Sequence, residues 1–168
     1  MKIELERVYP DSITPVKGST SAACYDLHAY LQNGCKVIHP NGEVQECETD
    51  YAVDYAVDIP AGGRMLVPTG WKMRCPEGYS IDFLPRSGLS FKEGVSVVNT
   101  PGVIDCDYSD QCYVALINHT NNSVVITHGQ RIAQMRLSPV IPTELEEVTE
   151  LSSVISNRNG GFGSSGKQ

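Results

Sequence analysis

Residues 85–90 and residues 102–108 carry side chains suited to phosphate chemistry. The first segment combines Arg86 with two serines and a glycine, and guanidinium, hydroxyl and unhindered backbone amide groups all donate hydrogen bonds to phosphate oxygens. The second segment holds Asp105 and Asp107, which would point to the same face of an extended strand. A carboxylate there could activate water as a general base or bind the water shell of magnesium; the alternative is a turn with solvated acids.

The C-terminal residues 159–166 are rich in glycine and serine, and Phe162 is their single aromatic residue. This segment has too little apolar surface to order itself, and on composition alone it is a frayed end or a linker. A more specific alternative is a lid that a nucleotide orders. Glycine amides can close around phosphate oxygens, and the ring of Phe162 can lie on a planar base.

Short alternating or β-branched runs, separated by Gly, Pro, Asn and Asp, must position these groups. We find no long amphipathic helix, and turn signals follow one another at close intervals. The sequence therefore predicts an all-β fold, a jelly-roll-like barrel or sandwich with a flexible glycine-rich C-terminal arm. The expected strands are 3–7, 22–29, 53–59, 64–70, 79–84, 95–98, 113–118, 124–126 and 131–140.

Residues 31–55 stand apart from this core, because they contain two dipeptides typical of hairpin turns, Asn33-Gly34 and Asn41-Gly42. We expect a hairpin-bearing insertion, which is either decoration or a contact surface for a protein partner. The expected domain spans residues 1–148, and a mobile arm follows at 149–168.

Composition excludes several classes of function. The net charge is −7 and no basic run is present, so nucleic acid is not an expected partner. No segment approaches the roughly 18 apolar residues that span a bilayer, and the N-terminus lacks a secretory apolar region. We expect no membrane association and a cytoplasmic protein, in the cytoplasm of the host if the source is viral. The six cysteines form no zinc-ligand spacing and are expected to be reduced thiols.

Five blocks of the sequence, in order, resemble the five motifs that define the dUTP pyrophosphatase (dUTPase) family. The resemblance runs from about residue 18 to 166 and leaves only the insertion uncovered. The matching blocks are residues 23–29, 85–89, 102–108, 129–135 and 158–166.

The resemblance implies hydrolysis of dUTP to dUMP and pyrophosphate, which lowers dUTP and supplies dUMP for dTTP synthesis. Asp105 matches the base that deprotonates the water attacking the α-phosphorus. Asp26 matches the carboxylate that reaches Mg²⁺ through water, while the three phosphates hold the ion directly.

The resemblance also implies a set of nucleotide contacts. Ser87 would lie near the bridge between the α- and β-phosphates, and Gln134 near the α-phosphate and the water. Tyr108 would pack beneath the deoxyribose and leave no room for a 2′-hydroxyl, and Phe162 would stack on uracil. The implied substrate-binding residues are Arg86, Ser87, Gly88, Asn99, Gly102, Ile104, Tyr108, Gln134, Arg158, Phe162, Gly163 and Ser164.

Because the family builds each site from more than one subunit, the resemblance implies a homotrimer in which the arm closes over a neighbouring active site. An enzymatic alternative is the related dCTP deaminase, or a bifunctional relative. That enzyme needs a glutamate on the strand after the third block, and residues 114–118 contain no acid. A second alternative is a nucleotide-sensing module that engages a protein partner through residues 31–55.

Overall fold

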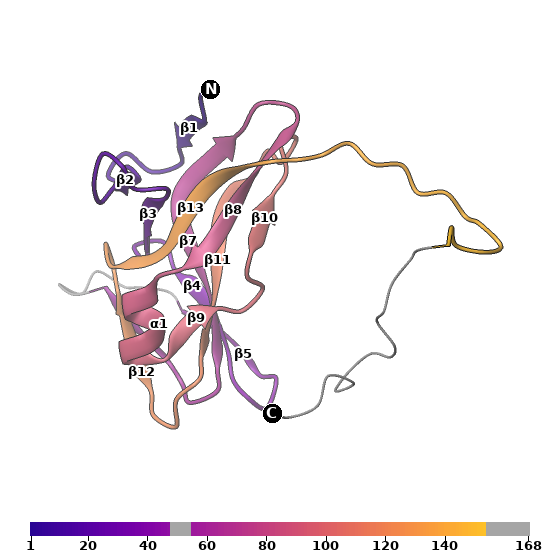
Figure 1. Cartoon of the computed structure of the whole chain (residues 1–168). Helices are drawn as coiled ribbons and strands as arrows, with labels where there is room; N and C mark the ends of the chain where they lie inside the picture. Colours follow the sequence, from indigo (N-terminus) through magenta and orange to yellow (C-terminus); the bar gives the residue numbers. More distant parts are fainter. Residues whose placement is uncertain (48–54, 154–168) are drawn as a thin grey trace.

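The computed structural model describes residues 1–47 and 55–153, which form strands, connecting loops and one short helix (Figure 1). The predicted all-β class is confirmed. The elements are β1 (Glu4–Arg7), β2 (Val16–Lys17), β3 (Tyr25–His28), β4 (Cys35–Ile38), β5 (Val44–Cys47), β6 (Ala56–Ile59), β7 (Arg64–Arg74), β8 (Tyr79–Pro85), α1 (Ser87–Glu93), β9 (Val95–Val97), β10 (Gly102–Ile104), β11 (Gln111–Asn118), β12 (Val124–Thr127) and β13 (Arg131–Pro139).

Two large sheets carry most of these strands. One sheet has the order β5-β4-β7-β11-β9, with β1 also paired to β7, and the other has the order β10-β8-β13-β3-β2. The short pair β12-β6 forms a separate two-stranded sheet. Every pairing between strands is antiparallel, so short turns suffice to connect many of them.

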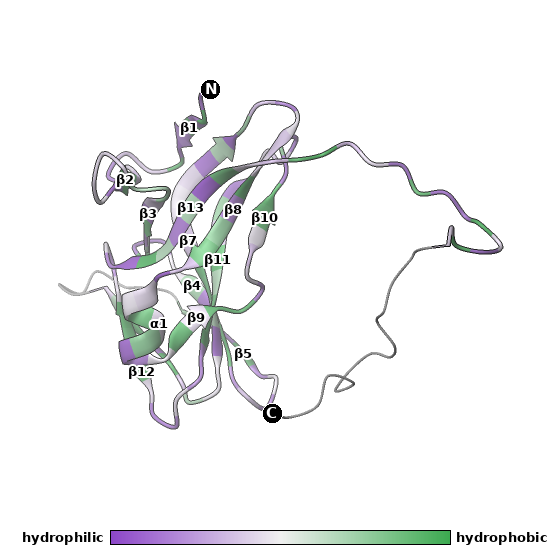
Figure 2. Ribbon diagram, in the orientation of Figure 1, coloured by the Kyte–Doolittle hydropathy of each residue, from purple (hydrophilic) through white to green (hydrophobic). Residues whose placement is uncertain are grey.

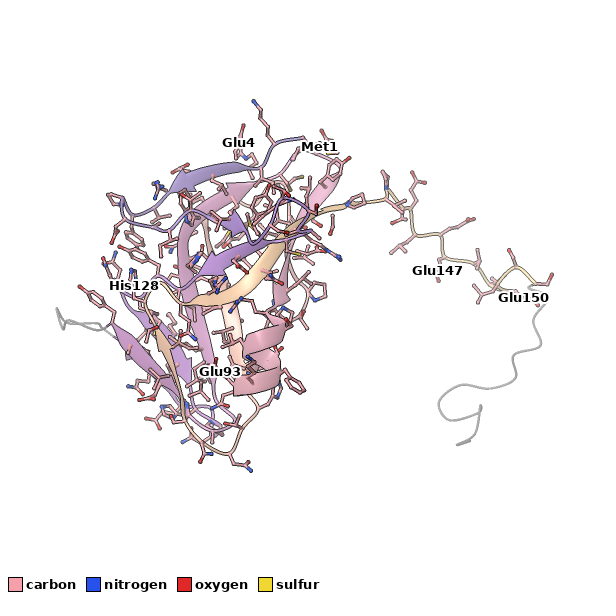
Figure 3. All side chains as sticks on the ribbon, turned by 60° about the vertical axis from the view of Figure 1, so that its left-hand side comes forward. Met1, Glu4, Glu93, His128, Glu147 and Glu150 are labelled. Atoms are coloured by element: carbon pink, nitrogen blue, oxygen red, sulfur yellow. The ribbon has the colours of Figure 1, made fainter. Side chains whose placement is uncertain are left out.

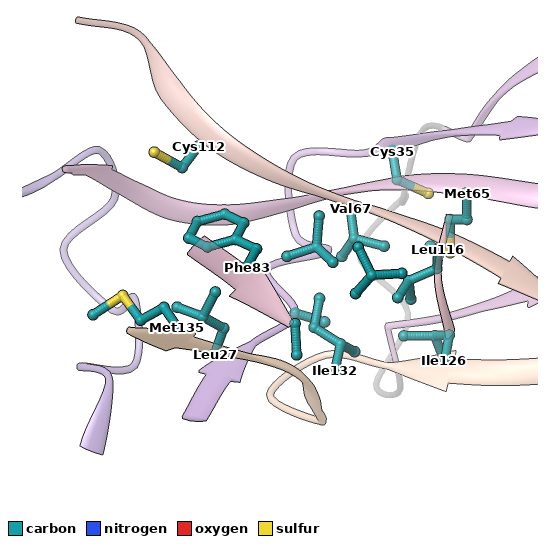
Figure 4. Close-up of a cluster of buried hydrophobic side chains, with 14 of the residues drawn as sticks. Leu27, Cys35, Met65, Val67, Phe83, Cys112, Leu116, Ile126, Ile132 and Met135 are labelled. Atoms are coloured by element: carbon teal, nitrogen blue, oxygen red, sulfur yellow. The ribbon is translucent and has the colours of Figure 1, made fainter. Parts of the chain in front are cut away.

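Alternating residues of these strands supply one continuous core (Figures 2 and 4). Met135 is opposite both Phe83 and Tyr25, and Leu27 lies on the same inward face. Leu27 and Phe83 are almost wholly buried, which contributes about 1.5–3 kcal/mol for each side chain. The neighbouring residues along these strands point the opposite way, and several of them are polar.

The insertion contains the predicted hairpin, and its turn is at Asn41-Gly42. Gly42 has a φ of 87°, and the Asn41 side chain accepts a hydrogen bond of 3.0 Å from the amide of Glu43. Asn33-Gly34 instead forms the turn that precedes β4. Because β4 pairs with β7, the hairpin extends one edge of a main sheet. Residues 48–54 of the insertion lie outside the described residues.

Helix α1 was not expected from the sequence, because it has only seven residues and begins at Ser87-Gly88. Within the helix Leu89 is buried, whereas Phe91 is 93% exposed, so the sequence has no amphipathic stripe from which the helix could be predicted. The helix ends at Gly94, whose φ of 68° allows its amide to bond to the carbonyl of Leu89.

Strand boundaries also differ from expectation. β7 continues to Arg74, four residues past the predicted end, and Gly70 inside it has a φ of 76°. The Ser12 hydroxyl donates a hydrogen bond of 3.0 Å to the Gly70 carbonyl. The two-residue strand β2 and the three-residue strand β10 are too short to be read from periodicity.

After β13 the chain leaves the sheets and runs outward to residue 153, with Glu147 and Glu150 projecting from it (Figure 3). Residues 154–168, which include most of the predicted arm, lie outside the described residues. The boundary at residue 148 stays a prediction. No helix among residues 1–47 and 55–153 has the length and hydropathy to cross a membrane.

Candidate functional site

A buried carboxylate lies between two arginines on the polar face of the β10-β8-β13-β3-β2 sheet. Asp26 on β3 is opposite Gln134 on β13, and Gln134 is opposite Leu84 on β8, so the three side chains share one face. Asp26 is only 5% exposed. Arg86, just after β8, and Arg131, at the start of β13, reach the same carboxylate.

The contacts within this group, here called the Asp26 cluster, engage both carboxylate oxygens. Arg86 Nε lies 3.4 Å from Oδ1, and Gln134 Nε2 donates to the same oxygen at 3.1 Å. Arg131 Nη1 donates to Oδ2 at 3.1 Å. One negative charge is thus shared by two guanidinium groups, which leaves the cluster with net positive charge. Such a site suits phosphate oxygens.

The backbone around Arg86 is open to an incoming group. Ser87 and Gly88 are exposed at the start of α1, and a Cβ added to Gly88 would meet no atom within 4 Å. Packing within this chain therefore does not require a glycine at position 88. The glycine leaves room for an incoming phosphate to approach the backbone closely.

A second group of predicted residues lines a separate hollow between β9 and β10. Asn99, Gly102 and Ile104 line a pocket of about 120 Å³, together with Phe83 and Val97. A Cβ on Gly102 would lie 3.4 Å from Asn99 Nδ2, in ordinary van der Waals contact, so the backbone at Gly102 lies close beside the Asn99 amide. We call this hollow the Asn99 pocket; its size and its amide suit a planar ring with polar edges.

The two acids of the third block do not share a strand face; of the two alternatives, the structure shows the turn with solvated acids. β10 ends at Ile104, and the Tyr108 amide donates to the Asp105 carbonyl at 3.2 Å, which makes a turn. Asp105 and Asp107 are both exposed. In the described residues, no hydrogen bond or ion pair engages the Asp105 carboxylate, which is therefore available to water.

Tyr108 lies outside the Asn99 pocket. Its ring lines a different hollow, beside Glu6 and Lys72, and its hydroxyl donates to the Gln111 carbonyl at 3.1 Å. The structure thus brings Asn99, Gly102 and Ile104 together without Tyr108 in the single chain.

The two groups of predicted residues are far apart in one chain. β3 and β10 are separated by β13 and β8, three strand spacings or roughly 14 Å across the sheet. Asp105 follows the end of β10 that is remote from Arg86. Ile104, the last residue of β10, pairs with Ile81 near the start of β8, whereas Arg86 comes after the end of β8. The Asp26 cluster and Asp105 of the same chain therefore cannot contact one phosphate group together.

The sequence reasoning missed Arg131 as an individual site residue, although it lies in the fourth block. Arg131 is opposite His28, and a register shift between Arg131 and Ala133 aims its side chain at Asp26. Its place inside the fourth block was the signal that could have identified it.

His28 was also missed. Burial lowers its pKa; nearby Asp26 opposes this effect, whereas Arg131 and Arg86 add to it. Among the described residues its buried Nδ1 has no hydrogen-bond partner. The ring is therefore a neutral neighbour of the Asp26 cluster at neutral pH.

The residues present fit a metal ion held through water. In the described part of the chain, no group of three His, Cys, Asp or Glu side chains is arranged to bind an ion. Both oxygens of Asp26 already accept hydrogen bonds, yet a carboxylate has about four lone-pair sites and can still accept one from a metal-bound water. This arrangement suits magnesium, which keeps several waters and binds substrate phosphates.

Four of the predicted site residues cannot be placed, because they lie outside the described residues. They are Arg158, Phe162, Gly163 and Ser164.

Comparison with known proteins gives consistent matches. The dUTPase family profile matches residues 49–166. A deoxyuridine 5′-triphosphate nucleotidohydrolase of Nautilia profundicola is 36% identical over 167 residues, which cover 99% of this chain and all of that protein. The enzyme of the same name from Rhizobium rhizogenes is 38% identical over 141 residues, covering 84% of this chain and 85% of that protein.

Solved structures share the fold. The dUTPase of Streptococcus mutans superposes with a TM-score of 0.65 at 26% identity, covering 86% of this chain and 99% of that one. A mutant dUTPase of Staphylococcus bacteriophage 80alpha with dUpNHpp gives a TM-score of 0.74 at 21% identity, covering 98% of each chain. The jelly-roll-like class predicted from the sequence is confirmed.

Proposed function

The chain belongs to the dUTPase family, and we propose that it hydrolyses dUTP to dUMP and pyrophosphate by attack of water on the α-phosphorus. The Asp26 cluster carries this proposal, because it gathers the first, second and fourth sequence blocks into one positively charged site. The reaction lowers the concentration of dUTP and supplies dUMP.

At the phosphate end, Arg86, Ser87 and Gln134 bind and orient the triphosphate. Arg86 keeps its side chain 24% exposed while it contacts Asp26, so part of the guanidinium still faces solvent. The amides at Ser87 and Gly88 lie on an exposed backbone where phosphate oxygens can approach. Donors fixed in this way stabilise the charge that develops on the leaving pyrophosphate.

Asp26 would hold Mg²⁺ through a water molecule, and the bound ion would supply charge neutralisation at the departing pyrophosphate. Arg131 positions the Asp26 carboxylate by its 3.1 Å contact with Oδ2.

At the nucleoside end, the Asn99 pocket takes the uracil ring. The amide of Asn99 and the backbone beside Gly102 supply the polar edge, and Phe83 and Val97 supply apolar walls. Asp105 lies directly after this pocket in sequence, where its exposed carboxylate takes a proton from the attacking water.

A complete site requires more than one subunit, and we propose a homotrimer. The roughly 14 Å across the sheet between β3 and β10 favours a site in which one chain supplies Asp105 and the Asn99 pocket. A neighbouring chain supplies the Asp26 cluster. The arm with Arg158, Phe162, Gly163 and Ser164 closes over the phosphates and the base.

The decisive experiment incubates the purified protein with dUTP, dCTP, dTTP and UTP, each with magnesium or with a chelator. Chromatography identifies the nucleotide product, and a coupled assay measures pyrophosphate. We expect dUMP and pyrophosphate from dUTP alone, and only with magnesium. Deamination of dCTP would assign the rival activity, and inertness toward all four nucleotides in a folded, dUTP-binding protein would refute hydrolysis.

A further inference from the structure

Two cysteines are directly opposite each other in the insertion hairpin. Cys35 on β4 pairs with Cys47 on β5, and the next pair in the ladder, Lys36 and Glu46, is joined by an ion pair of 2.8 Å. Opposed residues on antiparallel strands have Cα atoms about 4.5–5.5 Å apart. This spacing falls in the range that a disulfide bond needs, about 4.4–6.8 Å.

The two thiols also contact each other and differ in exposure. Cys35 is 8% exposed and belongs to the core (Figure 4). Cys47 is partly exposed. Burial, followed by the neighbouring Cys47 and Glu46, raises the pKa of Cys35 to about 12. Cys47 is therefore the thiol that reacts first with an outside molecule, and Cys35 is placed to react with Cys47.

A pocket of about 450 Å³ gives small molecules access to this pair. Its lining includes Cys35 and Cys47, the aromatic rings of Tyr9 and Tyr113, and Leu66 of β7. Leu66 and Tyr113 also line the Asn99 pocket, so the two hollows share a wall. The pair thus lies on a reachable surface beside the nucleoside end of the site.

We propose that Cys35 and Cys47 form a redox-active dithiol site, which a small-molecule disulfide such as oxidised glutathione converts reversibly to a disulfide. The Cys47 thiolate attacks one sulfur of the oxidant and releases one glutathione thiol. Cys35 then attacks the Cys47 sulfur of this mixed disulfide and releases the second glutathione thiol. The oxidant's S–S bond breaks, one S–S bond forms in the protein, and two electrons and two protons pass to glutathione.

Cys75 and Cys106 provide an internal comparison. Burial is the main cause that raises the pKa of Cys75, and nearby Cys106 adds to it, so these two thiols are also close. They are not opposed on a strand ladder, and the Cys75 thiol donates to the Tyr79 carbonyl at 3.1 Å. We expect this second pair to stay reduced under conditions that oxidise Cys35 and Cys47.

Peptide mapping of the full-length protein tests the proposal. The reduced enzyme is equilibrated with mixtures of oxidised and reduced glutathione, quenched in acid, alkylated and digested with trypsin. Cleavage after Lys17, Lys36 and Arg64 places the two cysteines on peptides 18–36 and 37–64. Because Cys24 shares the first peptide, the experiment is run in wild type, with fragmentation to locate the bond, and in Cys24→Ser.

We expect the two peptides to be linked through Cys35, in both backgrounds, and the link to disappear on addition of dithiothreitol. Linkage through Cys24, linkage of Cys75 to Cys106 while Cys35 and Cys47 are alkylated, or full alkylation of both hairpin thiols at every ratio would each overturn the proposal.

A second measurement does not depend on oxidation. Phenylarsine oxide, a trivalent arsenical that bridges two close thiols, is expected to bind the reduced enzyme and to protect Cys35 and Cys47 from alkylation. Cys47→Ala, which changes the more exposed partner, is expected to abolish this protection, whereas Cys106→Ala retains it. Equal protection in wild type and Cys47→Ala would contradict a dithiol site.

Discussion

At the scale of single residues, Asp105 and Asp107 are a matched pair of exposed acids in one loop. We expect Asp105→Asn to bind a non-hydrolysable dUTP analogue almost as wild type does, but to lose about 10²–10⁴-fold in kcat, because the amide keeps the shape and loses the base. Asp107→Asn is expected to retain most turnover. Steady-state kinetics and calorimetric binding measure the two effects, and wild-type kcat in Asp105→Asn would contradict the mechanism.

His128 is the second residue with a measurable consequence. Its Nδ1 accepts a hydrogen bond of 3.1 Å from the Leu31 amide, and burial lowers its pKa from 6.5, an effect that Asp11 partly opposes. The unfolded chain therefore takes up a proton on this histidine at a higher pH than the folded chain does. The stability that neutral His128 contributes to the fold is present above about pH 6.5 and is lost as pH falls through the folded pKa.

We therefore expect the free energy of unfolding to decrease between pH 7 and pH 5, and to decrease less in His128→Asn, which keeps an acceptor. Urea unfolding at several pH values measures this change. Exposed His119, replaced by Asn, serves as the matched control. An unchanged pH slope in His128→Asn would show that another group, such as His28, dominates acid destabilisation.

At the scale of elements, β7 contacts the N-terminal segment at Gly70, whose carbonyl accepts hydrogen bonds from the Val8 amide and the Ser12 hydroxyl. A Cβ there would lie 2.2 Å from the Ser12 hydroxyl oxygen, and the φ of 76° is itself unfavourable for other residues. We expect Gly70→Ala to destabilise the protein by about 2–4 kcal/mol, since it combines backbone strain with a clash. Gly78 has a similar φ of 79° but open space around it, so Gly78→Ala should cost only about 1 kcal/mol. Thermal unfolding of both variants tests this order. Equal losses of unfolding free energy would show that the clash with Ser12 contributes nothing.

At the scale of the whole molecule, the proposed homotrimer with shared sites predicts complementation between inactive subunits. Asp105→Asn and Arg86→Ala damage the two groups of residues that lie apart within one chain, one after β10 and the other around Asp26 on β3. Because a mixed trimer contains sites with an intact Asp105 from one chain and an intact Arg86 from another, co-expression is expected to restore a substantial part of dUTP hydrolysis. Each variant expressed alone stays inactive. If the mixture also stays inactive while mixed trimers form, each site lies within one chain.

The sequence by itself determined the class of fold and three residues of the Asp26 cluster. Alternation along β7, β8 and β13 predicted strands because period-2 patterns are local, and the turn at Asn41-Gly42 depends on only two residues. The resemblance of five blocks named Asp26, Arg86 and Gln134, and the structure brings them together.

Only the tertiary structure decided how these residues are held and how far apart the two groups lie. The contact of Arg131 with Asp26 depends on a register shift in β13. Helix α1 forms because Leu89 packs on the core, and a seven-residue sequence pattern does not predict that packing. Because β10 ends at Ile104, Asp105 and Asp107 lie in a loop and not on the strand. The pairing of Cys35 with Cys47 and the separation of β3 from β10 are set by strand order and register, and these arise from contacts between residues distant in sequence.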